Sequence, residues 1–204
     1  MEEDREFRRY RAVYSALSVP LALFHPVKIV GRENVPEGAA LVCAGHSSNW
    51  DPLIMAAALS RREHLCFMAK AELFRGRLLG GILRGIGTFP VDRGKADLAA
   101  IGTALRCLKN GKKVGIFPEG TRAAAEGEVR PKSGVIRIAE KAGVPVLPVF
   151  IPRKKPLFRR LTIVVGRPYR VGAEGRKLTR EELEAGADAL METIRALGGE
   201  GGRG

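Results

Sequence analysis

The sequence has no N-terminal apolar run long enough to cross a bilayer. The longest candidate, residues 12–24 (AVYSALSVPLALF), falls short of the ~20 residues that a hydrocarbon core requires, and Pro20 interrupts it. Basic residues precede it, as in a signal peptide, but the following FHPVKIVG offers no small-residue cleavage site. We therefore expect residues 1–30 to form a helical segment. It either lies in a membrane interface or packs on the domain, and periodicity alone leaves both alternatives open.

Cysteine is scarce, with only Cys43, Cys66 and Cys107 in the chain. Their odd number and wide spacing argue against a disulfide framework, and no metal-binding spacing such as Cys-x-x-Cys is present. Each stands among apolar residues. We interpret all three as small core side chains in a reducing compartment, and we expect no metal.

Aromatic residues make up only 6% of the sequence, which disfavours a nucleic-acid binder that stacks bases on exposed rings. Acidic residues are outnumbered, because 35 Lys and Arg against 22 Asp and Glu give a formal net charge of +13. This charge favours an anionic partner: a nucleic acid, an acidic protein, a phosphorylated substrate or an anionic membrane surface. Charge alone does not choose among them.

Strand-like and helix-like segments alternate after Gly31. Short apolar runs bounded by turn residues indicate strands within residues 39–45, 64–73, 88–93, 113–120, 144–151 and 161–171. Helical spacing of apolar residues indicates helices within residues 51–60, 75–87, 95–111, 132–143 and 178–197. Thr179 and Glu182 form a capping-box pattern at the start of the last helix.

This alternation predicts an α/β fold, a single-domain sandwich with a largely parallel or mixed central sheet flanked by helices. We expect the domain to span residues 31–197. The glycine-rich residues 198–204 are predicted to be a disordered tail.

The stretch GHSSNWDPL, residues 45–53, places His46 where a buried strand ends and Asp51 where a helix begins. Ligands of open α/β sheets gather at such strand ends, so the pair is a candidate base with an orienting carboxylate. Asp51 also has a structural explanation as the N-cap of a helix whose first residue is Pro52. This stretch alone leaves both alternatives open.

The segment GIFPEGTR, residues 115–122, concentrates functional groups behind another strand. Gly120 permits close backbone approach, and Thr121 and Arg122 offer donors to an oxyanion. Glu119 requires a substrate hydroxyl or a protein donor as its partner. So many polar groups behind a buried strand favour a site over a plain surface turn.

Two further segments are less specific by themselves. In GTFPVDRG, residues 87–94, Arg93 follows a strand and can present its planar fork to a phosphate, although a solvated arginine is equally simple. In GVPVLPVF, residues 143–150, the alternating prolines predict an edge strand or a rigidly shaped one that forms the wall of a pocket.

Taken in order, GHSSNWD, GTFPVDR, FPEGTR and VPVLPV resemble the four motifs of the glycerolipid acyltransferase family, which includes the 1-acyl-sn-glycerol-3-phosphate acyltransferases. The resemblance covers about residues 41–169. It departs from the family pattern at Gly45, where Asn is usual, and at Pro90, where an aliphatic residue is usual.

The resemblance implies transfer of a fatty acyl group from an acyl thioester to the free hydroxyl of lysophosphatidic acid, giving phosphatidic acid. His46 would act as general base, because imidazole can accept a proton near neutral pH, and Asp51 would orient it. No cofactor is expected, and acyl-CoA or acyl-carrier protein would be the co-substrate. The implied phosphate-binding residues are Arg93, Arg122 and Lys132, and the implied glycerol-site residues are Glu119, Gly120 and Thr121.

The stretch PRKKPLFRR, residues 152–160, sets five cations around Leu157 and Phe158. An apolar tip within a basic rim suits an anionic bilayer, so we expect peripheral or monotopic binding at the cytoplasmic face of the cell membrane. A solvated loop is the simpler alternative. Two other functions stay open at this stage: the same chemistry on another lysophospholipid or glycerol 3-phosphate, and a non-catalytic protein that binds anionic lipid.

Overall fold

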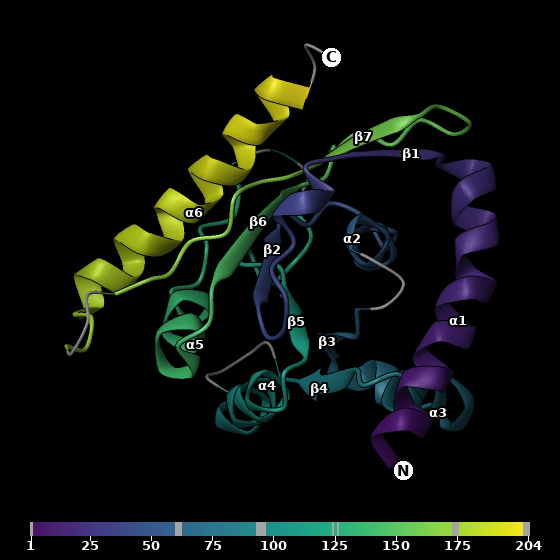
Figure 1. The fold of residues 1–204 in the computed structure, drawn as a ribbon, viewed down its shortest axis with the longest axis horizontal. Coiled ribbons are helices and arrows are strands. Elements are labelled where there is room, and N and C mark those ends of the chain that lie inside the picture. The colour runs from purple at the N-terminus through teal and green to yellow at the C-terminus, as the bar shows by residue number, and fades with distance from the viewer. Residues whose placement is uncertain are drawn as a thin grey trace.

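One mixed sheet forms the centre of the protein (Figure 1). The computed structural model describes residues 2–59, 63–92, 97–123, 125, 127–172 and 176–201. Within these ranges the sheet has seven strands in the order β1-β7-β6-β2-β5-β3-β4. They are β1 (Val27–Val30), β2 (Leu41–Ala44), β3 (Leu65–Lys70), β4 (Phe89–Val91), β5 (Lys113–Ile116), β6 (Val146–Phe150) and β7 (Leu161–Val165). Neighbouring strands run parallel except for the antiparallel pair β6 and β7.

Helices cover both faces of this sheet (Figure 1). They are α1 (Glu2–Phe24), α2 (Asp51–Ala58), α3 (Arg77–Gly85), α4 (Leu98–Lys109), α5 (Gly134–Ala142) and α6 (Arg180–Gly201), with short 3-10 turns at Arg32–Asn34 and Ala71–Phe74. At the start of α6, the hydroxyl of Thr179 accepts from the N–H of Glu182 at 3.2 Å, and the Glu182 carboxylate accepts from the N–H of Thr179 at 2.8 Å. The predicted capping box and the predicted fold class are both confirmed.

The two cores follow from the alternation of side chains along each strand. In β2, Leu41 and Cys43 pack toward α4, α5 and α6, whereas Val42 and Ala44 pack toward α1 and α2. All four residues are fully buried, which is why this strand reads as a continuous apolar run instead of an alternating one. Burial on both faces holds the end of β2 in a rigid position.

Parallel pairing determines where polar loops meet. Leu41 of β2 is in register with Val114 of β5, and Cys43 is in register with Ile116. The two strands therefore end side by side, and the chain leaves them at the same edge of the sheet. The loops that carry His46 and Glu119 are brought together by this register, although they are far apart in the sequence.

Helix α1 lies against one side of the domain (Figure 1). Tyr10 and Leu21 are buried in the core beneath it, whereas Leu17, Val19 and Leu23 are exposed. One side of α1 therefore packs on the domain, as one of the two predicted alternatives has it. The other side exposes apolar residues. Among the described residues, no helix has the length and apolar character needed to cross a membrane.

Three local details extend the comparison with the sequence. Of the two alternatives for the proline-containing strand, the edge position is excluded, because β6 has neighbours on both sides, and the rigidly shaped strand is left. Pro148 has no N–H to donate there, and its carbonyl accepts a hydrogen bond from the N–H of Gly166 at 2.9 Å. Strand β1, predicted to lie outside the domain proper, pairs with β7. Helix α6 continues to Gly201, into the segment predicted to be disordered, and residues 202–204 lie outside the described residues.

Candidate active site

His46 and Asp51 face each other across the loop that joins β2 to α2. Nδ1 of His46 lies 3.0 Å from Oδ2 of Asp51, and their side chains are 8% and 0% exposed. With Nδ1 directed at the carboxylate, the other ring nitrogen, Nε2, is left to meet a substrate. The pair has the geometry of a base held by an orienting acid.

The Asp51 carboxylate also organises the loop before it. Its Oδ2 accepts from the N–H groups of Ser47 at 2.6 Å and Ser48 at 2.7 Å. The predicted N-cap role of Asp51 is wrong, because Trp50 occupies the N-cap and Asp51 is the first residue of α2. The carboxylate turns back to the His46 loop instead of capping the N–H groups of its own helix.

Lys155 is the second partner of this carboxylate. Its Nζ lies 2.8 Å from Oδ1 of Asp51 and donates to the hydroxyl of Ser47 at 2.8 Å. Burial raises the pKa of Asp51, but the hydrogen bond with His46 and the Lys155 ammonium outweigh it, so the pKa lies below its ordinary value.

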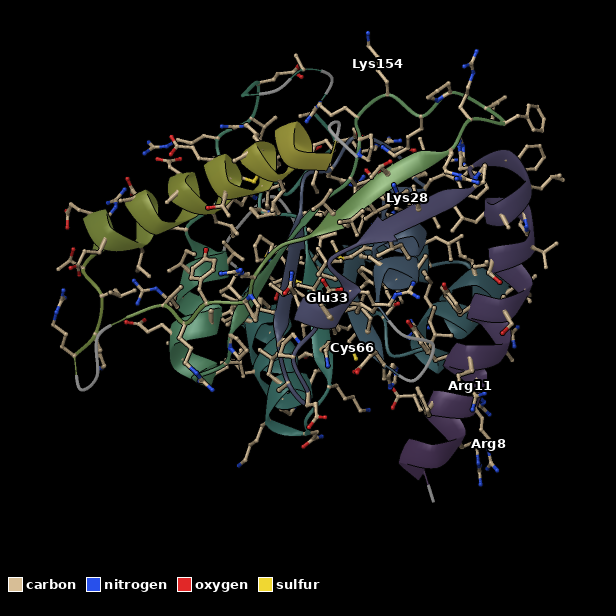
Figure 2. All side chains as sticks on the ribbon, turned by 45° about the horizontal axis from the view of Figure 1, so that its top comes forward. Arg8, Arg11, Lys28, Glu33, Cys66 and Lys154 are labelled. Carbon is tan, nitrogen blue, oxygen red and sulfur yellow. The ribbon has the colours of Figure 1, made fainter. Side chains whose placement is uncertain are left out.

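The sequence predicts Lys155 to belong either to the basic rim of a membrane-binding tip or to a solvated loop, and both predictions are wrong for this residue. Its side chain is only 5% exposed, whereas the neighbouring Lys154 points out into solvent (Figure 2). Arg153 also turns inward, with 20% of its side chain exposed. Nothing in the spacing of the five cations distinguishes the inward pair from the outward ones, because the loop follows no regular periodicity.

Glu119 joins the FPEGTR turn to the His46 loop. The N–H of His46 donates to its Oε2 at 2.5 Å, and Nη1 of Arg153 lies 3.5 Å from its Oε1. The N–H of Ala123 in turn donates to the carbonyl of His46 at 3.0 Å. Only 3% of Glu119 is exposed, so its carboxylate is satisfied by protein donors.

Both departures from the family motifs have a simple structural setting. At Gly45, a Cβ atom would lie 3.8 Å from Oε2 of Glu119, which is an ordinary contact. The backbone at this position therefore has room for a side chain and does not require glycine. Pro90 lies in β4, at the edge of the sheet, where the missing N–H costs no ladder hydrogen bond on the outer side. Neither departure removes a contact of His46 or Asp51.

An apolar cavity of about 560 Å³ adjoins the site. The Phe117 ring lines it and also stacks on His46, with ring centroids 4.2 Å apart and planes 18° from parallel. Apolar side chains from β3, β4, α4 and α5 form most of the remaining wall, including Met68, Val91, Ile101 and Ile138. His46 therefore lies beside a space large enough for an apolar part of a substrate.

The predicted phosphate ligands are described only in part. Nη1 of Arg122 donates to Oδ1 of Asn49 at 3.1 Å, which places this exposed arginine over the His46 loop. Lys132, before α5, lies against Gly120, whose φ of 69° belongs to the left-handed region. A Cβ at Gly120 would lie 3.0 Å from Cε of Lys132, so only glycine fits easily there. Thr121 is exposed beside them, and Arg93 lies outside the described residues.

A buried histidine–carboxylate pair beside an apolar cavity is the kind of site expected of an acyltransferase, and the comparison with known families gives the same class. Residues 26–152, more than half of the chain, match the family model described as Acyltransferase. The chain belongs to the acyltransferase family, a family of enzymes, as the four motifs predict.

The relatives are more specific. The chain is 32% identical over 193 residues to the 1-acyl-sn-glycerol-3-phosphate acyltransferase of Bacillus subtilis, covering 92% of this chain and 96% of the relative. It is 36% identical over 149 residues to a probable 1-acyl-sn-glycerol-3-phosphate acyltransferase of Mycoplasma pneumoniae, covering 70% of this chain and 56% of the relative.

A solved structure shares the architecture. The crystal structure of the 1-acyl-sn-glycerophosphate (LPA) acyltransferase PlsC from Thermotoga maritima superposes with a TM-score of 0.69 at 25% sequence identity. The match covers 94% of this chain and 79% of that one. The likeness therefore includes both the central sheet and most of the helices around it.

Proposed function

We propose that the protein transfers a fatty acyl group from an acyl thioester to the free hydroxyl of lysophosphatidic acid, giving phosphatidic acid. The observation that carries the proposal is the buried His46–Asp51 pair, 3.0 Å apart, at the end of β2. It stands in a chain of the acyltransferase family whose relatives bear the name 1-acyl-sn-glycerol-3-phosphate acyltransferase.

His46 is the general base of the proposed reaction. Its Nδ1–H donates to Asp51, and its Nε2 takes the proton of the acceptor hydroxyl as that oxygen attacks the thioester carbonyl. The tetrahedral adduct then collapses, the carbon–sulfur bond breaks, and the thiolate takes the proton from the imidazolium. Asp51 stays ionised and stabilises the imidazolium, and Lys155 holds the carboxylate in place. The hydroxyl attacks directly, so the protein needs no serine or cysteine nucleophile and no cofactor.

The acceptor phosphate binds to the cations at the mouth of the site. Arg122, over the His46 loop, and Lys132, against Gly120, are the two described ligands, and Arg93 is the third. Planar guanidinium groups match phosphate oxygens with two parallel hydrogen bonds. Glu119 contributes to the glycerol site indirectly, because its carboxylate holds the backbone of His46.

The acyl chain occupies the cavity beyond Phe117. That space is about 560 Å³, its wall is mostly apolar, and Gly120 and Lys132 also line it. An acyl group placed there brings its carbonyl carbon toward the His46 ring, which stacks on Phe117. Either acyl-CoA or acyl-carrier protein can supply such a chain, and both are anionic donors suited to a basic protein.

The membrane contact is proposed to involve an apolar tip composed of Leu23, Phe24, Leu157 and Phe158. The N–H of Phe158 donates to the carbonyl of Phe24 at 2.8 Å, and the two rings lie 5.7 Å apart. Leu23, Leu157 and Phe158 are 62%, 60% and 65% exposed, and Lys154, Arg159 and Arg160 are exposed around them. An apolar surface edged with cations suits peripheral binding to an anionic bilayer.

A donor and acceptor panel tests the proposed reaction. The purified protein is mixed in detergent with palmitoyl-CoA or palmitoyl-acyl-carrier protein, and with lysophosphatidic acid, lysophosphatidylcholine or glycerol 3-phosphate. We expect phosphatidic acid, with one free thiol released per product. Product from glycerol 3-phosphate alone would replace the proposed acceptor, and no product from any pair would overturn the proposed function.

A further inference from the structure

A second cluster of polar side chains lies away from His46, where α1 meets the start of β3. Glu6 comes from α1, His64 precedes β3, and Cys66 belongs to β3. One donor atom from each residue lies within 4.8 Å of the other two, and Nε2 of His64 is 3.6 Å from Oε1 of Glu6. Cys66 lies inside the molecule (Figure 2), and the His64 side chain is 8% exposed. None of the three residues takes part in the proposed acyl transfer.

Gly87 lies beside all three donor atoms. A Cβ atom built on Gly87 would lie 2.6 Å from Oε1 of Glu6, 2.9 Å from Nε2 of His64 and 3.2 Å from Sγ of Cys66. These distances leave no room for a side chain at this position, so glycine is what lets the three donor atoms converge there. Zinc binds carboxylate oxygen and imidazole nitrogen at about 2.0–2.2 Å and thiolate sulfur at about 2.3 Å. Two ligands of one zinc ion can therefore lie up to about 4.5 Å apart. The three donor atoms lie within 4.8 Å of one another, so small side-chain rotations would bring them to one ion.

The charges and neighbours of the cluster also fit a divalent ion. A thiolate from Cys66 and the carboxylate of Glu6 supply two negative charges, of which the Lys112 ammonium balances one in part. His64 binds as a neutral imidazole, and its Nε2 must exchange its contact with the carbonyl of Ile86, 3.2 Å away, for the ion. Lys112 lies 3.0 Å from Oε2 of Glu6, the oxygen opposite the one that faces His64, so it holds the carboxylate in this orientation. Cys107 on α4 lies next to Cys66 and supplies a second sulfur beside the site.

We propose that Glu6, His64 and Cys66 bind a zinc-class divalent metal ion, which fastens α1 to β3. The rings of Phe7 and Tyr10 on α1 lie 5.8 and 4.9 Å from the His64 ring and already dock the helix there. Binding the ion releases the thiol proton of Cys66 to solvent and joins two segments far apart in the chain. Glu6, with 29% of its side chain exposed, gives the ion a route of entry.

The signature of cysteine-containing metal sites is absent from the sequence because the ligands come from separate elements. His64, just before β3, and Cys66, within it, are two positions apart, and Glu6 joins them only when α1 packs. The site is therefore a property of the folded protein, and a chain without α1 in place would lose one of its three ligands.

The test uses the full chain after treatment with a chelator and exchange into chelator-free buffer. Zinc or cobalt(II) is added, excess metal is removed by gel filtration, and bound metal is measured by mass spectrometry. We expect one ion per chain, a thiolate-to-cobalt charge-transfer band, and a rise in Tm with zinc. Cys66→Ser should abolish the band, whereas Cys43→Ala, which removes a buried thiol elsewhere, should keep it.

Glu6→Gln is a second variant, needed in case the buried substitution Cys66→Ser prevents folding. Glu6 lies at the surface of a helix, where a substitution is better tolerated. This variant should fold, bind zinc at least roughly tenfold more weakly, and lose the rise in Tm. Retention of no zinc by the native chain would overturn the proposal. Equal zinc binding by the native chain, Cys66→Ser and Glu6→Gln would overturn it too, because the ion would then lie elsewhere.

Discussion

Nζ of Lys155 lies 2.8 Å from Oδ1 of Asp51, and Nδ1 of His46 lies 3.0 Å from Oδ2 of the same carboxylate. The proposed base is thus fixed by an acid that is itself fixed by a lysine from the loop between β6 and β7. That loop also carries Leu157 and Phe158 of the proposed membrane tip, so the base and the lipid surface are linked through a few residues of one segment.

Lys155→Met should lower kcat by at least about tenfold, a part of the roughly 10²–10⁴ that a positioned base contributes. Without the ammonium, the Asp51 carboxylate keeps its proton to a higher pH, so the acid limb of the pH–rate profile should move upward. The measurements are kcat, KM and the pH profile. Lys154→Met, the exposed neighbour, is the matched control, and Lys155→Arg should recover part of the rate. Equal profiles for the two methionine variants would exclude a positioning role for Lys155.

Asp51→Asn should cost roughly 3 kcal/mol of the free energy of unfolding near pH 7, because Lys155 loses its partner in a buried site. The pKa of Asp51 is lowered in the folded protein, so its ionised form favours folding. That contribution is present above the ordinary pKa of 3.8 and is lost as the pH falls through the folded value.

Urea unfolding of the native chain and Asp51→Asn across acidic and neutral pH measures this effect. The gap between the two free energies should narrow as the pH drops below 3.8. A gap that stays constant down to the acid limit would show that the Asp51 charge does not stabilise the fold.

Arg122→Ala should raise KM for lysophosphatidic acid by about tenfold and leave KM for the thioester nearly unchanged. The exposed guanidinium contacts Asn49 and is available to the acceptor phosphate in the proposed site. Arg137→Ala, an exposed arginine on α5, serves as the control for loss of positive charge. Equal increases in both KM values would refute the phosphate role.

Replacing both Leu157 and Phe158 by Asp should weaken binding to anionic vesicles, because the proposed tip loses two exposed apolar groups and gains negative charge. The measurement is flotation with vesicles of phosphatidylcholine, with and without phosphatidylglycerol. Leu98→Asp, at a leucine on α4 that is even more exposed, should bind like the native protein. An equal loss of vesicle binding in both variants would exclude this tip as the membrane contact. Binding by the native protein that does not depend on phosphatidylglycerol would exclude it as well.

The sequence predicts well which strands and helices carry the candidate site and that His46 pairs with Asp51. His46 and Asp51 are five positions apart, on one short loop and at the start of the helix that follows it, so local chain geometry brings them together. Polar residues that follow a buried strand, such as Glu119, can also be predicted to belong to the site, because parallel strands end at the same edge of the sheet.

Contacts that depend on the path of an irregular loop are not encoded in any local pattern. Lys155 and Lys154 are adjacent lysines, yet one reaches Asp51 and the other faces solvent (Figure 2). The strand order, which places β6 and its proline in the interior, is set by packing between distant segments. The Glu6, His64 and Cys66 cluster has the same origin, because α1 must dock before its ligands meet.

The most direct test of the proposed mechanism is acyl transfer to lysophosphatidic acid by the native protein and by His46→Ala, in detergent, with a long-chain acyl thioester. Circular dichroism and Tm establish that the variant is folded. We predict that the native protein forms phosphatidic acid and that the folded variant forms none above background. A variant that matches the native rate would contradict the assignment of His46 as the base.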